Sequence, residues 1–230
     1  MISPVIHQFW DKQKMPERFR EFMRTFQEFN PEYEMVLWTP QRICSDPGFV
    51  RIHDFMQDDR LPSTIKSDLF RYNVLYLYGG FYADTDCECL RPLDDLRTTP
   101  FVVGWEREED TLRLKKFVEA HFLGSFPWHP LGNATLDMCI ENVRMRYVNG
   151  KPVFENVWDL LYTSGPQMFQ KVIERYCVTP LSQNCFTPFA YQSRPSTAEL
   201  LALPGPAYVF HHFAGLQPGG WTTAPNFTPS

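Results

Sequence analysis

The chain contains 230 residues, of which 43% are hydrophobic and 16% are aromatic, and this apolar content suits one folded domain with a sizeable core. Its formal net charge of −5 excludes the basic surface that is typical of nucleic-acid-binding proteins. The sequence offers no run of about 18 apolar residues, so the pattern predicts no membrane-spanning segment.

Strand and helix patterns follow one another along the first 61 residues. Residues 5–10 form an apolar run that predicts a first, central strand. Residues 16–29 predict an amphipathic helix, because Phe and Met side chains recur three or four positions apart. Residues 33–38 predict a second strand, and residues 41–61 predict one or two short helices.

The most informative stretch is residues 66–86, KSDLFRYNVLYLYGGFYADTD. It predicts a helix that begins near Ser63 or Thr64 and ends at Gly79, because helices commonly end with a glycine in a left-handed conformation. The apolar run 81–83 is too short for a helix and predicts a strand. This strand leads directly into Asp84 and Asp86.

Asp84 and Asp86 are spaced so that two carboxylates can converge on one hard cation. Such oxygen ligands suit Mn²⁺ or Mg²⁺, which also accept phosphate oxygens from a substrate. In an open α/β sheet, ligands bind outside the carboxyl ends of the strands, where this pair is expected. Surface turns also produce Asp-x-Asp by chance, so the pair alone is a weak signal.

Asp68 and Arg71 strengthen the signal, because they share one face of the helix that leads into this strand. One interpretation is a surface ion pair that contributes about 0.3–0.5 kcal/mol. In the other, Asp68 accepts hydrogen bonds from sugar hydroxyls, and Arg71 donates to those hydroxyls or to phosphate.

The block K-S-D-L-x-R-Y-x-x-L-Y-x-Y-G-G-x-Y-x-D-T-D resembles the DXD sugar-binding region of one glycosyltransferase family. That family, glycosyltransferase family 32, includes yeast initiating α-1,6-mannosyltransferases, inositolphosphoceramide mannosyltransferases and bacterial capsule glycosyltransferases. The likeness extends to the N-terminus. The resemblance implies a GT-A fold, which is an α/β fold whose mixed, mostly parallel sheet is flanked by helices and binds a nucleotide sugar.

The resemblance also implies a donor site. Its catalytic residues would be Asp84, Asp86, Arg71 and Asp68. Its donor-binding residues would be Ile6, His7, Trp10, Asp68, Arg71, Tyr82, Asp84, Thr85, Gly165 and Trp221. An aromatic ring at Trp10 would stack on the base. A core tryptophan is equally open for Trp10, and for His7 we favour a hydrogen-bonded core histidine.

The second half of the chain contains fewer family-like positions. Residues 101–105 predict a strand, the charged run 106–116 a solvated segment, and residues 115–128 an acceptor-binding segment. Asn133 is expected to cap a helix that runs towards Tyr147. Residues 148–152 predict a turn, and Pro166 predicts the first position of a helix through residue 176.

A last strand over residues 207–210 runs into His211 and His212. A late histidine completes the metal site in many enzymes of this fold, so one of the two is expected to join Asp84 and Asp86, with His212 preferred for its position in the family pattern. Residues 218–221, which end at Trp221, are expected to form a flap over the nucleotide.

The cysteines lack the Cys-x-x-Cys spacing of structural metal sites. They are Cys44, Cys87, Cys89, Cys139, Cys177 and Cys185. The Cys87-x-Cys89 pair could hold a soft metal, but we expect reduced, partly buried thiols.

These features predict a single catalytic domain with a nucleotide-sugar half at 1–105, an acceptor and C-terminal half at 106–221 and a loose tail at 222–230. The expected enzyme is a metal-dependent retaining glycosyltransferase that moves a hexose or N-acetylhexosamine, with UDP-sugars favoured over GDP-mannose. Its acceptor would be a glycan, a lipid-linked sugar or a protein. We expect a cytoplasmic enzyme from a bacterium or a virus, or a trimmed catalytic domain.

Two other functions fit parts of the pattern. One is a catalytically silent protein that only binds a nucleotide sugar, although the intact Asp84 and Asp86 argue against it. The other is a nucleotidyltransferase, because paired aspartates also serve phosphoryl chemistry. It would release pyrophosphate from a nucleoside triphosphate, whereas a glycosyltransferase releases a nucleoside diphosphate.

Overall fold

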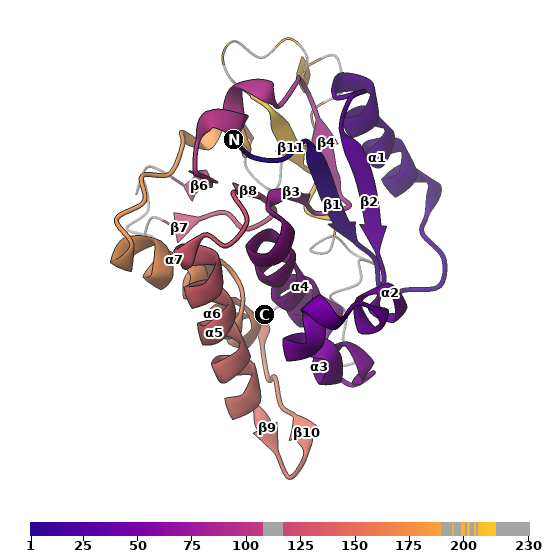
Figure 1. Cartoon of the computed structure of the whole chain (residues 1–230), viewed down its shortest axis with the longest axis vertical. Coiled ribbons are helices and arrows are strands. Elements are labelled where there is room, and N and C mark those ends of the chain that lie inside the picture. The colour runs from indigo at the N-terminus through magenta and orange to yellow at the C-terminus, as the bar shows by residue number, and fades with distance from the viewer. Residues whose placement is uncertain are drawn as a thin grey trace.

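A computed structural model describes residues 1–107, 117–189, 195, 199–200, 202, 205 and 207–214. Its strands alternate with helices along the first half of the chain (Figure 1). The strands are β1 (Val5–Phe9), β2 (Glu34–Trp38), β3 (Gly80–Ala83), β4 (Cys87–Cys89), β5 (Phe101–Val102), β6 (Trp105–Arg107), β7 (Phe117–Val118), β8 (Phe122–Ser125), β9 (Tyr147–Val148), β10 (Lys151–Pro152) and β11 (Val209–His211). The α-helices are α1 (Glu17–Phe29), α2 (Pro40–Ser45), α3 (His53–Gln57), α4 (Ser63–Tyr78), α5 (Pro130–Met145), α6 (Val157–Thr163) and α7 (Pro166–Arg175). The 3₁₀ helices are η1 (Pro47–Ile52), η2 (Asp94–Thr98) and η3 (Gln183–Cys185).

The main sheet has the strand order β2-β1-β3-β8-β5. Its first three strands are parallel, whereas β8 runs antiparallel to both β3 and β5. The register places His7 beside Tyr82, and Tyr82 beside Leu123. The carboxyl ends of β1 and β3 therefore lie together at one edge of the sheet. The expected α/β fold, with a mixed sheet, parallel core strands and flanking helices, is confirmed.

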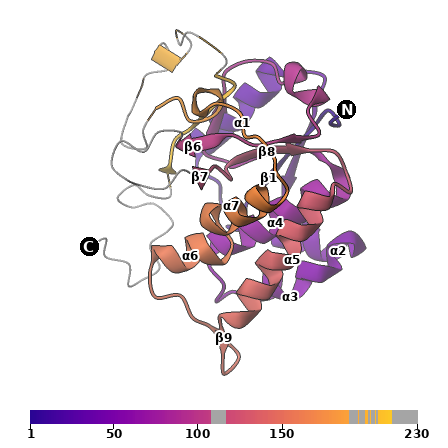
Figure 2. The ribbon, with the colours of Figure 1, turned by 90° about the vertical axis from the view of Figure 1, so that its left-hand side faces the viewer.

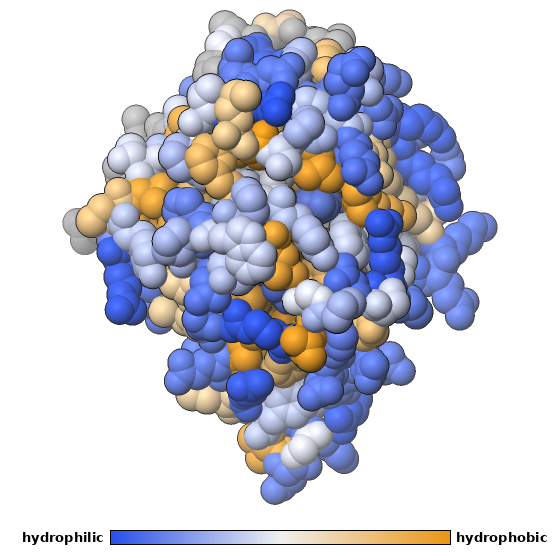
Figure 3. Space-filling view, viewed as in Figure 1, coloured by the Kyte–Doolittle hydropathy of each residue, from blue (hydrophilic) through white to orange (hydrophobic). Residues whose placement is uncertain are grey.

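The sheet is covered by helices on both faces (Figures 1 and 2). Side chains alternate along each strand, so Ile6 and Phe81 join a core with α1, whereas Phe9 and Tyr82 join a core with α4, α5 and α7. Hydrophilic side chains gather over the outer side of α1, and hydrophobic residues on the face seen in Figure 3 form separate patches. Among the described residues, no helix is long and apolar enough to cross a membrane.

Helix α4 places two charged side chains of the predicted site in the interior, because it is buried on nearly all sides. Its buried residues include Asp68 and Arg71 as well as its apolar positions. The helix ends at Gly79, whose φ of 65° is left-handed, as expected. Gly80 follows with a φ of 83°, and a Cβ there would lie 2.7 Å from the carbonyl oxygen of Val5. This close approach lets β3 pair with β1 directly after the helix.

Several boundaries differ from the predictions. Pro62, rather than Ser63 or Thr64, stands at the N-cap of α4 and makes no side-chain cap. Helix α5 begins at Pro130 rather than at Asn133, because the side chain of His129 caps it through the backbone N–H of Leu131.

Two further elements, both after residue 100, differ from the predictions. The segment predicted as one strand over residues 101–105 is divided between β5 and β6 at Gly104, where a Cβ would lie 2.5 Å from the ring of Phe186. Helix α6 was not predicted at all, and its N-terminus carries a capping box between Asn156 and Asp159.

A second, two-stranded sheet brings the end of the described chain to this edge. Strand β11 pairs antiparallel with β4, and the register sets His211 opposite Cys87. Because β4 begins immediately after Asp86, the pairing carries His211 to the Asp-x-Asp loop from 125 residues away. The hairpin of β9 and β10 follows α5 and projects at the bottom of the view in Figure 1.

Candidate active site

A pocket of about 300 Å³ lies at the carboxyl ends of β1 and β3. Of the residues that the sequence predicted for the site, the lining includes Trp10, Asp68, Arg71, Asp84, Thr85, Asp86, Gly165 and His211. The predicted residues Ile6, His7, Tyr82 and His212 lie outside the lining. Trp221 and the expected flap lie outside the described residues. The main features of the predicted site therefore converge on one pocket.

Arg71 links the helix to the Asp-x-Asp loop. Its guanidinium lies 3.0 Å from Oδ1 of Asp84 and 3.2 Å from Oδ1 of Asp68, and it also donates to the carbonyl oxygen of Ala120. Arg71 is only 6% exposed, so these contacts are buried. Removal of one partner from such a buried ion pair typically costs about 3–5 kcal/mol, because the other charge is left uncompensated. The pair is thus part of the interior and not a solvated surface ion pair.

Asp68 is held by a second helix of the pocket wall. The hydroxyl of Ser164 donates to its Oδ2 at 2.6 Å, just before Gly165 at the N-cap of α7. Burial raises the pKa of Asp68 to about 6, although Arg71 and the Ser164 hydroxyl both lower it. The carboxylate is positioned by contacts from α4 and from the start of α7, which supports a role in orienting a ligand.

Asp84 is oriented from one side. Its Oδ1 accepts hydrogen bonds from Arg71 and from the hydroxyl of Tyr82, which also contacts Ser67. Within the described residues, Oδ2 of Asp84 has no hydrogen-bond partner. Tyr82 is 1% exposed, so the structure assigns it to the support of Asp84 and corrects its expected place in the donor pocket.

Asp86 faces the C-terminal segment. Its Oδ1 lies 3.1 Å from Nε2 of His211, and its Oδ2 accepts the backbone N–H of Ala214 at 2.8 Å. Burial raises the pKa of Asp86, but His211 and the Ala214 N–H outweigh this and hold the pKa well below its usual range. Asp86 is therefore a carboxylate at neutral pH.

The two late histidines point in different directions. His211 contacts Asp86 and lines the pocket, whereas His212 lies 3.0 Å from Glu88 and stacks on Phe22 with ring centroids 4.0 Å apart. Neighbouring residues at a strand end face opposite sides, so only one histidine can reach the loop. The structure thus places His211, and not the preferred His212, beside Asp86 in the pocket.

The donor atoms at this loop fit a hard divalent cation. The ligand atoms of Asp86, Cys87 and His211 all lie within 4.8 Å of one another. Burial raises the pKa of the Cys87 thiol far above its usual value, so this thiol stays protonated and is a poor ligand. The Asp86 carboxylate and one imidazole nitrogen remain, and these suit Mn²⁺ or Mg²⁺; Asp84 lies outside this close group of ligand atoms. All six cysteines are free thiols, and the group of close ligand atoms found among the described residues contains Cys87 without Cys89.

Two residues predicted for the donor site belong to the core. Ile6 is fully buried, and His7 bonds through Nε2 to the carbonyl oxygen of Gly79 and through Nδ1 to the indole N–H of Trp38. Burial lowers the pKa of His7 to about 4, so the ring is neutral. Both residues align β1 with β3 without lining the pocket, which corrects the expected donor role of Ile6 and agrees with the hydrogen-bonded core histidine favoured at position 7. Trp10 does line the pocket, and it also packs against Phe19.

Residues 119–121 contribute to the site, although the sequence pointed to an acceptor segment there. The backbone oxygen of Ala120 accepts from Arg71, and that of His121 accepts the backbone N–H of Asp84 at 2.8 Å. The His121 ring lines the pocket, and Glu119 lies 2.6 Å from its Nε2. Burial lowers the pKa of His121, but Glu119 outweighs it and raises the pKa to about 9. The signal available in the sequence was a glutamate and a histidine inside an apolar run.

The Asp-x-Asp loop and its supporting helix fall within a recognised family region. Residues 16–102 match the family described as "Glycosyltransferase sugar-binding region containing DXD motif". This chain carries a glycosyltransferase DXD region. The resemblance found in residues 66–86 is thereby confirmed, and the DXD aspartates are Asp84 and Asp86.

Named relatives share this region. The chain is 29% identical over 182 residues to inositol phosphoceramide mannosyltransferase 2 of Schizosaccharomyces pombe, a match that covers 76% of this chain and 47% of that protein. It is 37% identical over 112 residues to inositol phosphoceramide mannosyltransferase 3 of the same yeast, with 46% and 29% covered. The chain thus spans less than half of the length of these two relatives.

A solved structure shares the fold. The structure of PaToxG Glycosyltransferase superposes with a TM-score of 0.54 at 16% identity, covering 76% of this chain and 70% of that one. This likeness agrees with the expected GT-A type of architecture around the DXD region.

Proposed function

We propose that this chain is a metal-dependent retaining glycosyltransferase that moves a hexose or N-acetylhexosamine from a nucleotide diphosphate sugar to a hydroxyl acceptor. The observation that carries the proposal is the convergence of Asp84, Asp86 and His211 with Arg71 and Asp68 on one pocket. Residues 1–105 would supply most of the donor site, and residues 106–221 would supply His211 and the acceptor side.

Two classes of donor sugar are compatible with the proposed function. The sequence favoured UDP-sugars, whereas the names of the two yeast relatives point to a mannosyl group. Both donor classes present a diphosphate to the DXD loop and sugar hydroxyls to Asp68. The proposed acceptor class is a glycan, a lipid-linked sugar or a protein hydroxyl.

The DXD loop and β11 would hold Mn²⁺ or Mg²⁺ through Asp84, Asp86 and His211. When bound, the ion would supply a Lewis acid against the diphosphate, which gains negative charge as the bond to the sugar breaks. Arg71 adds a fixed positive charge on the same side of the pocket. The contacts of Arg71 with Asp84 and Asp68 fix the positions of these two carboxylates relative to each other.

The proposed transfer proceeds on one face of the sugar. The bond from C1 to the acceptor oxygen forms as the bond from C1 to the diphosphate oxygen breaks, and the departing phosphate takes the acceptor proton. Retention of configuration then gives an α-linkage from an α-nucleotide sugar. Asp68 would fix the sugar hydroxyls during this step, because its own position is set by Arg71 and Ser164. Trapping of a covalent glycosyl-enzyme adduct would contradict this route.

The test measures nucleoside diphosphate release from UDP-glucose, UDP-galactose, UDP-N-acetylglucosamine and GDP-mannose. Each donor is offered with Mn²⁺, with Mg²⁺ and with EDTA. The variant Asp86→Asn removes a charge at the DXD loop, and Asp54→Asn is its matched control because Asp54 is exposed on α3. We expect one donor to be hydrolysed only with metal, with activity lost in Asp86→Asn and kept in Asp54→Asn.

Other outcomes select the alternatives. Donor binding without turnover would indicate a catalytically silent protein. Pyrophosphate release from a nucleoside triphosphate, with no hydrolysis of any sugar donor, would indicate a nucleotidyltransferase. Donor hydrolysis that persists in EDTA and in Asp86→Asn would overturn the metal-dependent mechanism.

A further inference from the structure

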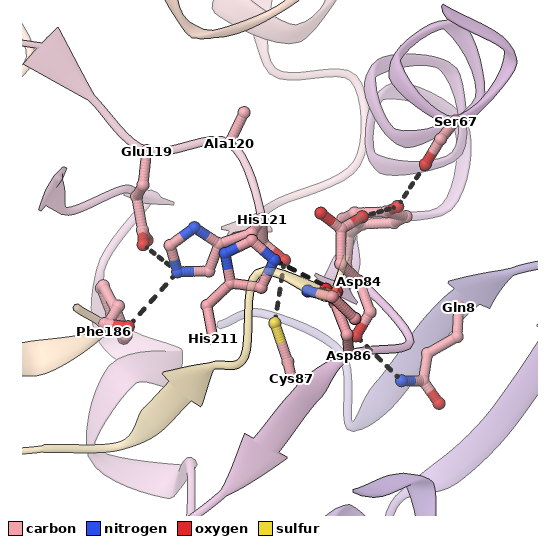
Figure 4. Close-up of polar contacts among 12 residues, drawn as sticks. Gln8, Ser67, Asp84, Asp86, Cys87, Glu119, Ala120, His121, Phe186 and His211 are labelled. Carbon is pink, nitrogen blue, oxygen red and sulfur yellow. Dashed lines mark hydrogen bonds and ion pairs between the residues drawn. The ribbon is translucent and has the colours of Figure 1, made fainter. Parts of the chain in front are cut away.

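Behind His211 lies a buried pair of titratable residues that the proposed mechanism does not use. Glu119 is 0% exposed and His121 is 4% exposed. Oε2 of Glu119 lies 2.6 Å from Nε2 of His121 (Figure 4). Among the described residues, no other group hydrogen-bonds to the carboxylate oxygens of Glu119. The carboxylate therefore depends on one imidazole for its charge compensation.

The position of this pair is built into the backbone. The N–H of Glu119 donates to the carbonyl oxygen of Gly104 at 3.0 Å, and a Cβ on Gly104 would lie 3.3 Å from Oε1 of Glu119. The ring of His121 also meets the carbonyl oxygen of Phe186 at 3.3 Å from Nε2. Glu119 and Phe186 thus fix the edge of the His121 ring that points away from the pocket.

The face of the His121 ring contacts the proposed metal ligand. The rings of His121 and His211 stack with centroids 4.3 Å apart and an interplanar angle of 15°. Phe213 contacts His211 as well, with centroids 4.2 Å apart. Stacking constrains the plane of a ring, which sets the direction in which its nitrogen atoms point. Here Nε2 of His211 points to Oδ1 of Asp86.

We propose that Glu119 and His121 are positioning residues that hold the His211 ring in the orientation needed to bind metal together with Asp86. The inference rests on the proposed function, because it assumes a cation at the DXD loop. Residues behind a metal ligand commonly set its orientation, and their loss typically weakens metal binding about 10–100-fold. Here the support comes through a stacked ring instead of a hydrogen bond to the ligand.

The chain contains an internal comparison for this pair. Glu88 on β4 and His212, which directly follows β11, form a second carboxylate–imidazole contact at 3.0 Å. That pair stacks on Phe22 and does not line the pocket. Two pairs of the same chemistry therefore lie close together, and only one of them supports His211.

The experiment replaces the ring of His121 while avoiding an uncompensated buried charge. Both test proteins carry Glu119→Gln, and position 121 is changed to His121→Phe in one and to His121→Leu in the other. The two double variants share the loss of the ion pair and fill the space with apolar atoms. They differ in the flat ring that can stack on His211. Glu88→Gln is the control at the second pair.

The readout is the dissociation constant for Mn²⁺, measured from the electron paramagnetic resonance signal of free Mn²⁺, with circular dichroism as a check of folding. We expect the Phe double variant to bind Mn²⁺ within about threefold of the wild type and the Leu double variant about 10–100-fold more weakly. Glu88→Gln should bind as the wild type does.

Equal Mn²⁺ affinity in the two double variants would overturn the inference. Weakened Mn²⁺ binding in Glu88→Gln would also overturn it, because His212 would then be the supported ligand. If either result were found while the wild type showed metal-dependent donor hydrolysis, the proposed function would be kept and only the role of Glu119 and His121 would be lost. A wild-type protein that binds no Mn²⁺ or Mg²⁺ and hydrolyses no donor would overturn both.

Discussion

The buried neutral His7 gives the stability of the protein a defined dependence on pH. Its ring is 3% exposed and bridges Gly79 and Trp38, which lie on either side of β1. Burial is the main cause that lowers its pKa from 6.5 to about 4; the bond to Gly79 opposes this shift and Arg42 adds to it. In the unfolded chain the ring takes up a proton near pH 6.5, whereas in the folded protein it stays neutral down to about pH 4.

The direction in which the free energy of unfolding changes with pH follows from proton uptake by the unfolded state. Between these two pKa values the unfolded state binds more protons, so the free energy of unfolding rises with pH. The contribution of His7 is therefore complete above pH 6.5 and is lost as the pH falls towards 4. A pKa of about 4 in place of 6.5 corresponds to about 3 kcal/mol in total. Of this, about 2 kcal/mol is lost between pH 7 and pH 5.

The assay is urea unfolding at pH 7 and at pH 5 for the wild type and for His7→Gln. Glutamine can place an amide N–H near the Gly79 carbonyl, but it does not titrate. We expect the wild type to lose about 2 kcal/mol more than the variant over this range. Other titrating groups contribute to both proteins and cancel in the difference. Equal losses would show that His7 is not held neutral in the folded state.

Three further predictions concern the helix and the loop that build the site. Gly80→Ala should destabilise the protein by more than about 2 kcal/mol in urea unfolding, because the new Cβ would meet Val5. Gly150→Ala, which has an equally left-handed backbone but open space around it, should cost only about 1–2 kcal/mol. Equal effects of the two substitutions would contradict the steric reasoning. Arg71→Lys should lower kcat of donor hydrolysis about 100-fold or more, because lysine cannot bridge two carboxylates and a carbonyl with a planar fork, and an unchanged kcat would contradict this role. Ser164→Ala should raise the KM for the donor more than it lowers kcat, because it releases Asp68 without moving Asp84; a drop in kcat at constant KM would refute this assignment.

The sequence determined much of the donor side of the site, for local reasons. Helical spacing placed Asp68 and Arg71 on one face of α4, and two consecutive glycines fixed the point at which the chain turns into β3. The distance between these residues and the DXD aspartates is short along the chain. Their convergence therefore needed only a helix, a turn and a strand in the correct order.

The sequence favoured a core histidine at position 7, but it did not reveal the core role of Ile6 or the partners of His7. An apolar strand at the start of a nucleotide-binding sheet can present either face to a ligand. The parallel pairing of β1 with both β2 and β3 set the His7 ring between Gly79 and Trp38. The same register buried Tyr82 under Asp84 instead of in the pocket.

The sequence by itself thus determined the fold class and the DXD region with its aspartates, because a block of matching residues in register carries that information locally. Only the tertiary structure showed that His211, and not His212, lies beside Asp86, because this depends on the register of β11 against β4 across 125 residues. It also decided that Glu119 and His121 stand behind His211. No spacing along the chain predicts that two rings 90 residues apart will stack, since strand pairing alone brings them together.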